Sequence, residues 1–216
     1  MEIAIFFTSP MPKLVLEKTN LIIVGAWNNA IIQPNWLSQY FPELIKEKEI
    51  PAEFVAGPTT FFRFIFNEFI CEPRKGSLIF TPKKEGDAIF SFISQLALGI
   101  YDKLPHTPIL AVGHNFVFHL EDKEHFALEN ELGGQKRNIY KGIVDQEVDF
   151  MQIKHTFSFP TNQLNLIYDL KASNKSLAMN YHYAVSKKDT VTSAINELKN
   201  NYLASIGKCK KLILGG

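Results

Sequence analysis

The sequence has few cysteines and no long apolar segment. Its two cysteines, Cys71 and Cys209, are far apart along the chain, whereas disulfide frameworks and zinc sites usually show closely spaced cysteines. We therefore expect two free thiols in a cytoplasmic protein. No apolar run approaches the roughly 20 residues that span a bilayer, and Glu2 stands where a signal peptide would carry a basic residue. These absences argue against a membrane or secreted protein, and we interpret the start of the chain as a first strand.

Net charge is also nearly absent. The 216 residues include 23 basic and 22 acidic side chains, which leaves a formal charge of +1. Nucleic-acid binders usually carry a basic excess that replaces counterions on phosphates. We therefore expect neither nucleic acid nor an anionic membrane surface as a partner.

Recognisable catalytic motifs are missing as well. There is no G-x-S-x-G nucleophile elbow, and Cys71 has no histidine near it in sequence, so we interpret it as structural. The stretch "ELGGQKRN" (131–138) has paired glycines but lacks the spacing of a phosphate-binding loop. We interpret it as a helix end followed by an exposed loop, and we expect no cofactor.

The sequence does contain many strand signals. Hydrophobic residues make up 46% of the chain and include 18 phenylalanines, which favour strands and an aromatic core. Apolar and polar residues alternate in "FFRFIFNEFI" (61–70), which leads through Gly76 into "SLIFTP", a hairpin pattern. "MQIKHTFSF" (151–159) alternates in the same way. A second hairpin is expected between "LNLIYDL" and "SLAMNYHYAV".

Two longer segments have the spacing of amphipathic helices. The first begins at Asp87, which we expect to be its N-cap, and continues to Leu104. The second begins at Asp189 and is expected to end at Gly207, a residue type common just after a helix. Shorter helices are expected at "NWLSQYF", after Pro34, and at "DKEHFALENEL" (122–132).

The order strand, short helix, several strands, long helix occurs twice. "LIIVGAWN" from Leu21 resembles "ILAVGHN" from Ile109, "KGSLIF" resembles "NKSLAM", and a lysine pair precedes each long helix. The alternative is an α+β chain in which such short matches arise by chance. The sequence predicts an α+β fold, mainly antiparallel sheet with two long helices, as one compact domain (1–216). Its halves, 1–105 and 106–216, would be related by a pseudo-twofold axis.

The histidines offer two candidate sites. His119 and His125 lie in "VGHNFVFHLEDKEHF", which is dense in acid, but a zinc site needs three or four convergent ligands. His114 and His119 point to opposite faces of a strand because they are an odd number of residues apart. His114 and His155 each share a face with apolar residues, so both are expected to point into the core. They are packing residues or, as the sharper hypothesis, a buried catalytic pair.

Aromatic residues supply candidate binding surfaces. Such side chains are either core packing or a recognition surface, because tryptophan and tyrosine are enriched in binding hot spots. The first group comprises Trp27, Trp36 and Tyr40, and the second comprises Tyr181, His182 and Tyr183.

Without a catalytic constellation, the sequence favours a non-catalytic protein-binding or assembly module that binds a protein partner or a second copy of itself. One alternative is a small hydrolase-like or metal-assisted enzyme that uses histidines and acids of the second half. Another is a carrier of a small apolar ligand.

Overall fold

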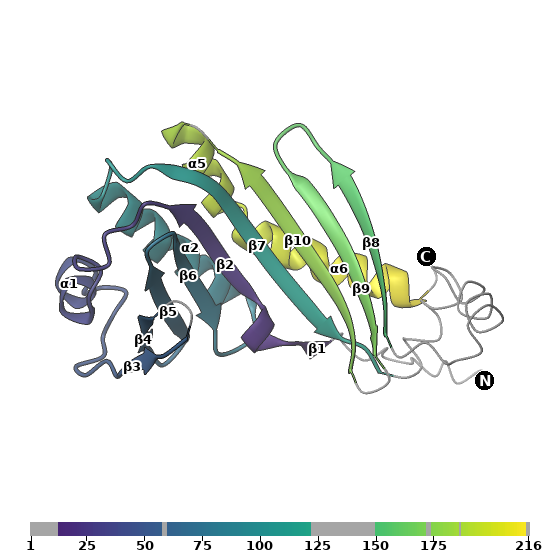
Figure 1. Ribbon diagram of the computed structural model, residues 1–216, viewed down its shortest axis with the longest axis horizontal. Coiled ribbons are helices and arrows are strands. Elements are labelled where there is room, and N and C mark those ends of the chain that lie inside the picture. Colours follow the sequence, from purple (N-terminus) through teal and green to yellow (C-terminus); the bar gives the residue numbers. More distant parts are fainter. Residues whose placement is uncertain (1–12, 58–59, 122–149, 172–173, 186, 215–216) are drawn as a thin grey trace, which may run out of the picture.

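The computed structural model describes residues 13–57, 60–121, 150–171, 174–185 and 187–214 (Figure 1). The strand expected at the start of the chain, the short helix expected at 122–132 and the loop at 131–138 lie outside these residues. All statements below concern the described part of the chain.

The strands form one ten-stranded antiparallel sheet. Its order is β3-β4-β5-β6-β2-β7-β10-β9-β8, and β1 pairs with β7 outside this path (Figure 1). A 3-10 helix, η1 (Leu16–Lys18), separates the first two strands. The strands are β1 (Lys13–Leu14), β2 (Asn20–Gly25), β3 (Ala52–Val55), β4 (Phe61–Ile65), β5 (Phe69–Arg74), β6 (Ser77–Pro82), β7 (Ile109–His119), β8 (Phe150–Ser158), β9 (Gln163–Lys171) and β10 (Asn174–Ala184).

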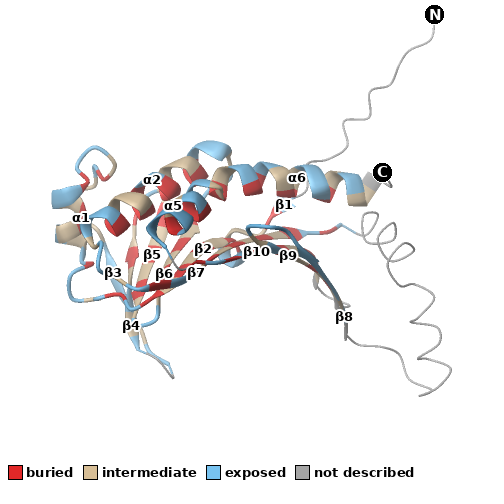
Figure 2. Ribbon diagram, turned by 90° about the horizontal axis from the view of Figure 1, so that it is seen from above, coloured by how far each residue is buried: buried red, intermediate tan, exposed pale blue. Residues whose placement is uncertain are grey.

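The α-helices lie on one side of the sheet, so the predicted α+β class is confirmed (Figure 2). They are α1 (Pro34–Tyr40), α2 (Asp87–Lys103), α5 (Lys188–Asn196) and α6 (Leu198–Leu214). Because helices cover only this face, the residues of the central strands, such as β2, β5, β6 and β7, alternate between a buried inner face and a more accessible outer face.

Both long helices depart from their predicted ends. Asp87 is the first residue of α2, and the residue before it is Gly86, whose φ of 122° favours glycine. The second predicted helix, from Asp189 to Gly207, is two helices, α5 and α6, which are separated at Glu197. Its predicted end at Gly207 is also wrong, because α6 continues to Leu214. Cys209 is buried and Leu212 packs against the core, so the apolar stripe of α6 extends past the glycine and outweighs the weak helix propensity of that residue.

The alternating run 61–70 forms two strands rather than one. The chain turns between β4 and β5, where the N–H of Phe66 donates to the carbonyl of Phe69 at 2.9 Å. The rings of Phe66 and Phe69 stack with their centroids 4.4 Å apart, and both are buried. The predicted hairpin with Gly76 at its bend forms between β5 and β6.

The strand order places the first strands of the two predicted halves side by side. β2 and β7 pair antiparallel at the centre, with β6, β5 and β4 on one side and β10, β9 and β8 on the other. The chain runs from the outside inward through four strands, β3 to β6, before α2, and through three strands, β8 to β10, before α5 and α6. This order agrees with two similar halves, and the internal duplication itself stays a prediction.

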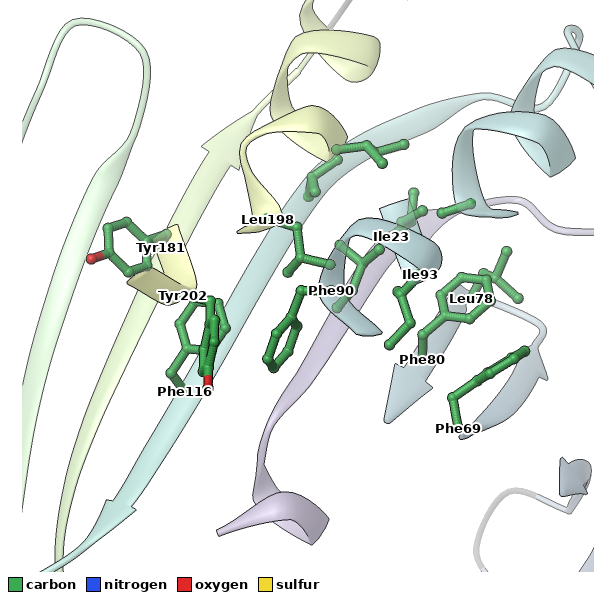
Figure 3. Close-up of a cluster of buried hydrophobic side chains, with 14 of the residues drawn as sticks. Ile23, Phe69, Leu78, Phe80, Phe90, Ile93, Phe116, Tyr181, Leu198 and Tyr202 are labelled. Carbon is green, nitrogen blue, oxygen red and sulfur yellow. The ribbon is translucent and has the colours of Figure 1, made fainter. Parts of the chain in front are cut away.

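One apolar core contains residues of both halves. Phe90 of α2 lies 4.2 Å from Tyr202 of α6 between ring centroids, and Phe116 of β7 packs edge-on against Phe90 (Figure 3). The hydroxyl of Ser94 donates to the carbonyl of Ile195 at 3.0 Å within this core. The central strands and the helices α2, α5 and α6 therefore pack into one shared core.

Candidate functional site at the open edge of the sheet

The two ends of the sheet differ in their outermost strands. At one end, the four-residue β3 covers β4. At the other end, the nine-residue β8 pairs with β9 and with no other strand of the described residues (Figure 1). β8 is therefore the long edge strand of this sheet, and edge strands present unpaired backbone groups.

The hydrogen-bonding direction of β8 follows from its turn into β9. The N–H of Phe159 donates to the carbonyl of Asn162 at 2.8 Å. Because neighbouring residues of an antiparallel strand point their backbone groups to opposite sides, odd-numbered residues of β8 bond to β9. The N–H and C=O groups that face the open side are those of the even-numbered residues, among them Gln152, Lys154, Thr156 and Ser158.

An apolar groove of about 290 Å³ lies beside this edge, on the helix side of the sheet. Phe157 and Phe159 form one wall and are 47% and 51% exposed, which is high for phenylalanine. The groove is exposed because α6 packs mainly over β7 and β10 and leaves His155 and Phe157 on the inner face of β8 exposed. Its lining residues are Phe157, Phe159, Leu164, Leu166, Lys208, Lys211 and Leu212.

A buried tyrosine hydroxyl lies behind the groove. Ser205 donates to the hydroxyl of Tyr181 at 3.2 Å, and the ammonium of Lys208 lies 3.4 Å from the same oxygen. Lys208 also stands over the Tyr181 ring at 5.7 Å from its centroid. These contacts hold the lysine ammonium at the border between the groove and the core, where it can meet an anionic group.

His114 belongs to a second buried polar cluster. Its side chain is fully buried, and the amide of Asn201 donates to its Nδ1 at 2.9 Å and to the Tyr183 hydroxyl at 2.6 Å. Burial lowers the pKa of His114 to about 3, an effect that the backbone of Ala194 partly offsets. Nδ1 acts as an acceptor, so His114 is neutral with its proton on Nε2. Among the described residues, that atom has no hydrogen-bond partner of good geometry.

The remaining histidine predictions have separate outcomes. The expectation that His155 points into the core is wrong, because its side chain is exposed on β8. Strand phase placed it on the correct inner face, opposite buried Leu166, but no helix covers β8 there. β10 and β9 lie between His114 and His155, so the structure does not bring this pair together. His119 is exposed beside Lys13 and Ser176, and His125 lies outside the described residues.

The predicted aromatic surfaces separate into buried and exposed members. Trp27 is buried, with its indole N–H donating to the carbonyl of Ile23 at 2.9 Å, so it offers no contact surface. Trp36 packs against the core and lies 5.0 Å from the exposed Tyr40 between ring centroids. In β10, Tyr181 and Tyr183 point into the core, whereas His182 is exposed on the outer face.

A row of amides on the outer face was not predicted. Asn20, Asn115, Asn180, Asn165 and Thr156 lie opposite one another in five adjacent strands. Asn115 donates to Asn20 at 2.6 Å, Asn180 donates to Asn115, Asn165 donates to Asn180 at 3.3 Å, and Thr156 donates to Asn165 at 2.8 Å. This amide ladder ends at β8, and only the alignment of the strands reveals it.

Neither cysteine is in a disulfide, as the sequence predicted, and both are buried. Burial, and to a smaller extent the charge of Glu72, raises the pKa of Cys71. A thiol with a raised pKa is a poor nucleophile because the thiolate is the reactive form.

Among the described residues, no helix is both long and apolar enough to cross a membrane. Nor does the described part of the chain contain three or more histidine, cysteine or acidic side chains grouped to hold a metal ion. No protein-family model and no curated protein matches this chain.

Proposed function

We propose that the protein is a non-catalytic protein-binding or assembly module whose partner adds a strand to β8. The observation that carries the proposal is the difference between the sheet ends. β4 has an outer neighbour, β3, whereas the longer β8 has none among the described residues.

Strand addition uses backbone hydrogen bonds for affinity and alternate side chains for specificity. The backbone groups on the open side of Gln152, Lys154, Thr156 and Ser158 can form these hydrogen bonds. The groove beside Phe157 and Phe159 provides specificity, because alternate apolar side chains of an added strand would enter it. Burying exposed phenylalanine surface supplies a driving force of roughly 25 cal/mol per Å².

The test is the substitution Lys154→Pro, with Lys154→Ala as its matched control. Proline removes an N–H that faces the open side, so the β8–β9 hydrogen bonds are kept, and proline is tolerated on edge strands for this reason. Both variants lose the lysine charge. We expect Lys154→Ala to keep the wild-type assembly, and Lys154→Pro to weaken it at least tenfold in sedimentation velocity.

The proposal is contradicted if the protein assembles, with itself or with another protein, and both variants assemble as the wild type does. It is also contradicted if the purified protein turns over a substrate and loses that activity when one titratable residue is replaced. Circular dichroism of both variants verifies that the sheet is intact, and hydrogen exchange at β9 verifies that its bonds to β8 remain.

The groove also favours a second candidate function, the carriage of a small apolar ligand. Its walls are phenylalanine and leucine, and Lys208 and Lys211 stand at its border. Ligand pockets have this combination of apolar walls and a few polar groups. Native mass spectrometry of the purified chain would reveal a co-purified small molecule, and Leu166→Trp, which fills the groove, would remove that mass.

A further inference from the structure

We infer that the strand added to β8 is the β8 of a second copy, antiparallel to the first and related to it by a twofold axis between the two His155 residues. The inference rests on the proposed function, because it names the partner of the same edge. It makes the protein a homodimer with one sheet continuous across both copies.

The opposite end of the sheet shows how such an edge is closed. Between β3 and β4, Phe54 and Phe62 meet edge to face with ring centroids 5.4 Å apart, and Glu53 pairs with Arg63 at 2.5 Å. One face of the β3–β4 strand pair is thus aromatic and the other is polar. β8 has the same alternation, with Ile153 and Phe157 on its inner face and with Gln152, Lys154 and Thr156 on its outer face.

Symmetry restricts the register of two identical antiparallel strands. An axis perpendicular to the sheet keeps inner faces with inner faces, so it must pass beside a residue that lies opposite itself. Centring on Lys154 would place two lysines directly opposite each other, which is destabilising. Centring on Thr156 would leave only residues 154–158 overlapping.

Centring on His155 keeps residues 152–158 paired and separates the lysines. Lys154 of one copy then lies opposite Thr156 of the other, and Ile153 lies opposite Phe157. The open-side groups of these even-numbered residues fall on hydrogen-bonded pairs, as an antiparallel ladder requires. The two His155 residues meet at a non-hydrogen-bonded pair, where the Cα atoms are about 4.5 Å apart.

Charge supports a second copy at this edge. The inner face of β8 from Ile153 to Phe157 has no side chain with a permanent charge, so two such faces can meet without an unpaired ion. Lys208 and Lys211 lie near Phe157 and Phe159, away from the axis. The equivalent positions Phe157 in the two copies are separated by about 13 Å along the strands, so these lysines do not face each other.

The experiment is oxidative cross-linking of His155→Cys, with Lys154→Cys as its matched control, together with sedimentation equilibrium of the wild type. A disulfide needs Cα atoms about 4.4–6.8 Å apart. The two His155 positions meet that distance, whereas the two Lys154 positions are about 8 Å apart in this register. His155 is exposed, so the substitution should not disturb folding. Cys71 and Cys209 are buried and give little background.

We expect a wild-type dimer, a covalent dimer for His155→Cys, and none for Lys154→Cys. We also expect His155→Lys, which places two permanent charges at the axis, to raise the dissociation constant at least tenfold. Cross-linking through Lys154→Cys alone would overturn the register. If the wild-type chain stays monomeric but binds another protein through β8, the partner is not a second copy, and the proposed function still holds. A monomer whose β8 pairs with another segment of its own chain overturns both.

Discussion

The two ends of the sheet differ in what lies beside their outer strands. At the β3–β4 end, Phe54 and Phe62 contact each other and Glu53 pairs with Arg63, so the outermost long strand has neighbours on both sides. At the β8 end, Phe157 and Phe159 border an open groove and the backbone of four residues faces outward. Under the proposed function, a partner strand completes the sheet at β8, whereas β3 of the same chain covers β4 at the other end.

Between these ends lies the centre that both halves share. Phe90, Phe116 and Tyr202 join α2, β7 and α6, and all three are buried. Substitutions at this buried centre should therefore cost the most stability, and under the proposed function the β8 end supplies the binding surface. Substitutions at the centre, in the amide ladder and at the ends should therefore lower the free energy of unfolding by different amounts.

The largest effect is expected at the centre. Phe90→Ala removes a ring that contacts Phe116 and Tyr202, and the cavity it leaves should lower the free energy of unfolding by about 3–5 kcal/mol. Phe157→Ala, at the open end, should cost less than about 1 kcal/mol because nearly half of its surface is already exposed. Urea unfolding in the Lys154→Pro background measures both values without a contribution from self-association. Equal losses of unfolding free energy in the two variants would show that the centre contributes no more to stability than the open end.

The next effect is the pH dependence of stability that is caused by His114, on the inner face of β7. In the folded protein His114 has a pKa of about 3, whereas a histidine in the unfolded chain has a pKa of about 6.5. The unfolded state therefore binds more protons between these values. Stability should rise with pH across this window and fall on acidification, by at most about 1.4 kcal/mol per pH unit.

His114→Leu tests this assignment. The variant should be less stable at neutral pH because the Asn201 amide loses one of its two partners, and its stability should depend less on pH between 3 and 6.5. Tyr183, the other side chain in the cluster, has a raised pKa and stays neutral in this range. An unchanged slope in urea melts over that window would show that His114 is not the titrating group.

A smaller effect is expected in the amide ladder. Asn180 donates to Asn115 and accepts from Asn165, and it is half-buried. Asn180→Ala leaves both neighbours without that partner and should cost about 1–2 kcal/mol. Thr156→Ala, at the exposed end of the same ladder, should cost less than about 0.5 kcal/mol. Thermal unfolding of the two variants compares them directly, and a larger loss at Thr156 would contradict the ladder's dependence on burial.

The sequence predicted the elements better than their surroundings. Alternation identified β8, β9 and β10 because the strand period is local, and it assigned His155 to the correct face. It could not show that α6 would cover β7 and β10 and leave β8 open, because that depends on packing between distant segments. The same reason hides the ladder, since Asn20, Asn115 and Asn180 become neighbours only through strand pairing. At Gly207, the local stop signal was outweighed by the packing of Cys209.

The smallest effect is expected at the closed end, where the surface pair Glu53–Arg63 joins β3 to β4. Both side chains are partly exposed, so solvent screens the attraction and the coupling should be between about 0 and 1 kcal/mol. A double-mutant cycle with Glu53→Ala and Arg63→Ala measures it, with the ring contact of Phe54 and Phe62 left in place. Because backbone pairing and the ring contact hold β3, hydrogen exchange at β4 should stay slow in the double variant. Fast exchange there would mean that a charge pair is needed to close an edge, and the uncharged inner face of β8 would then be a weaker site for a second copy.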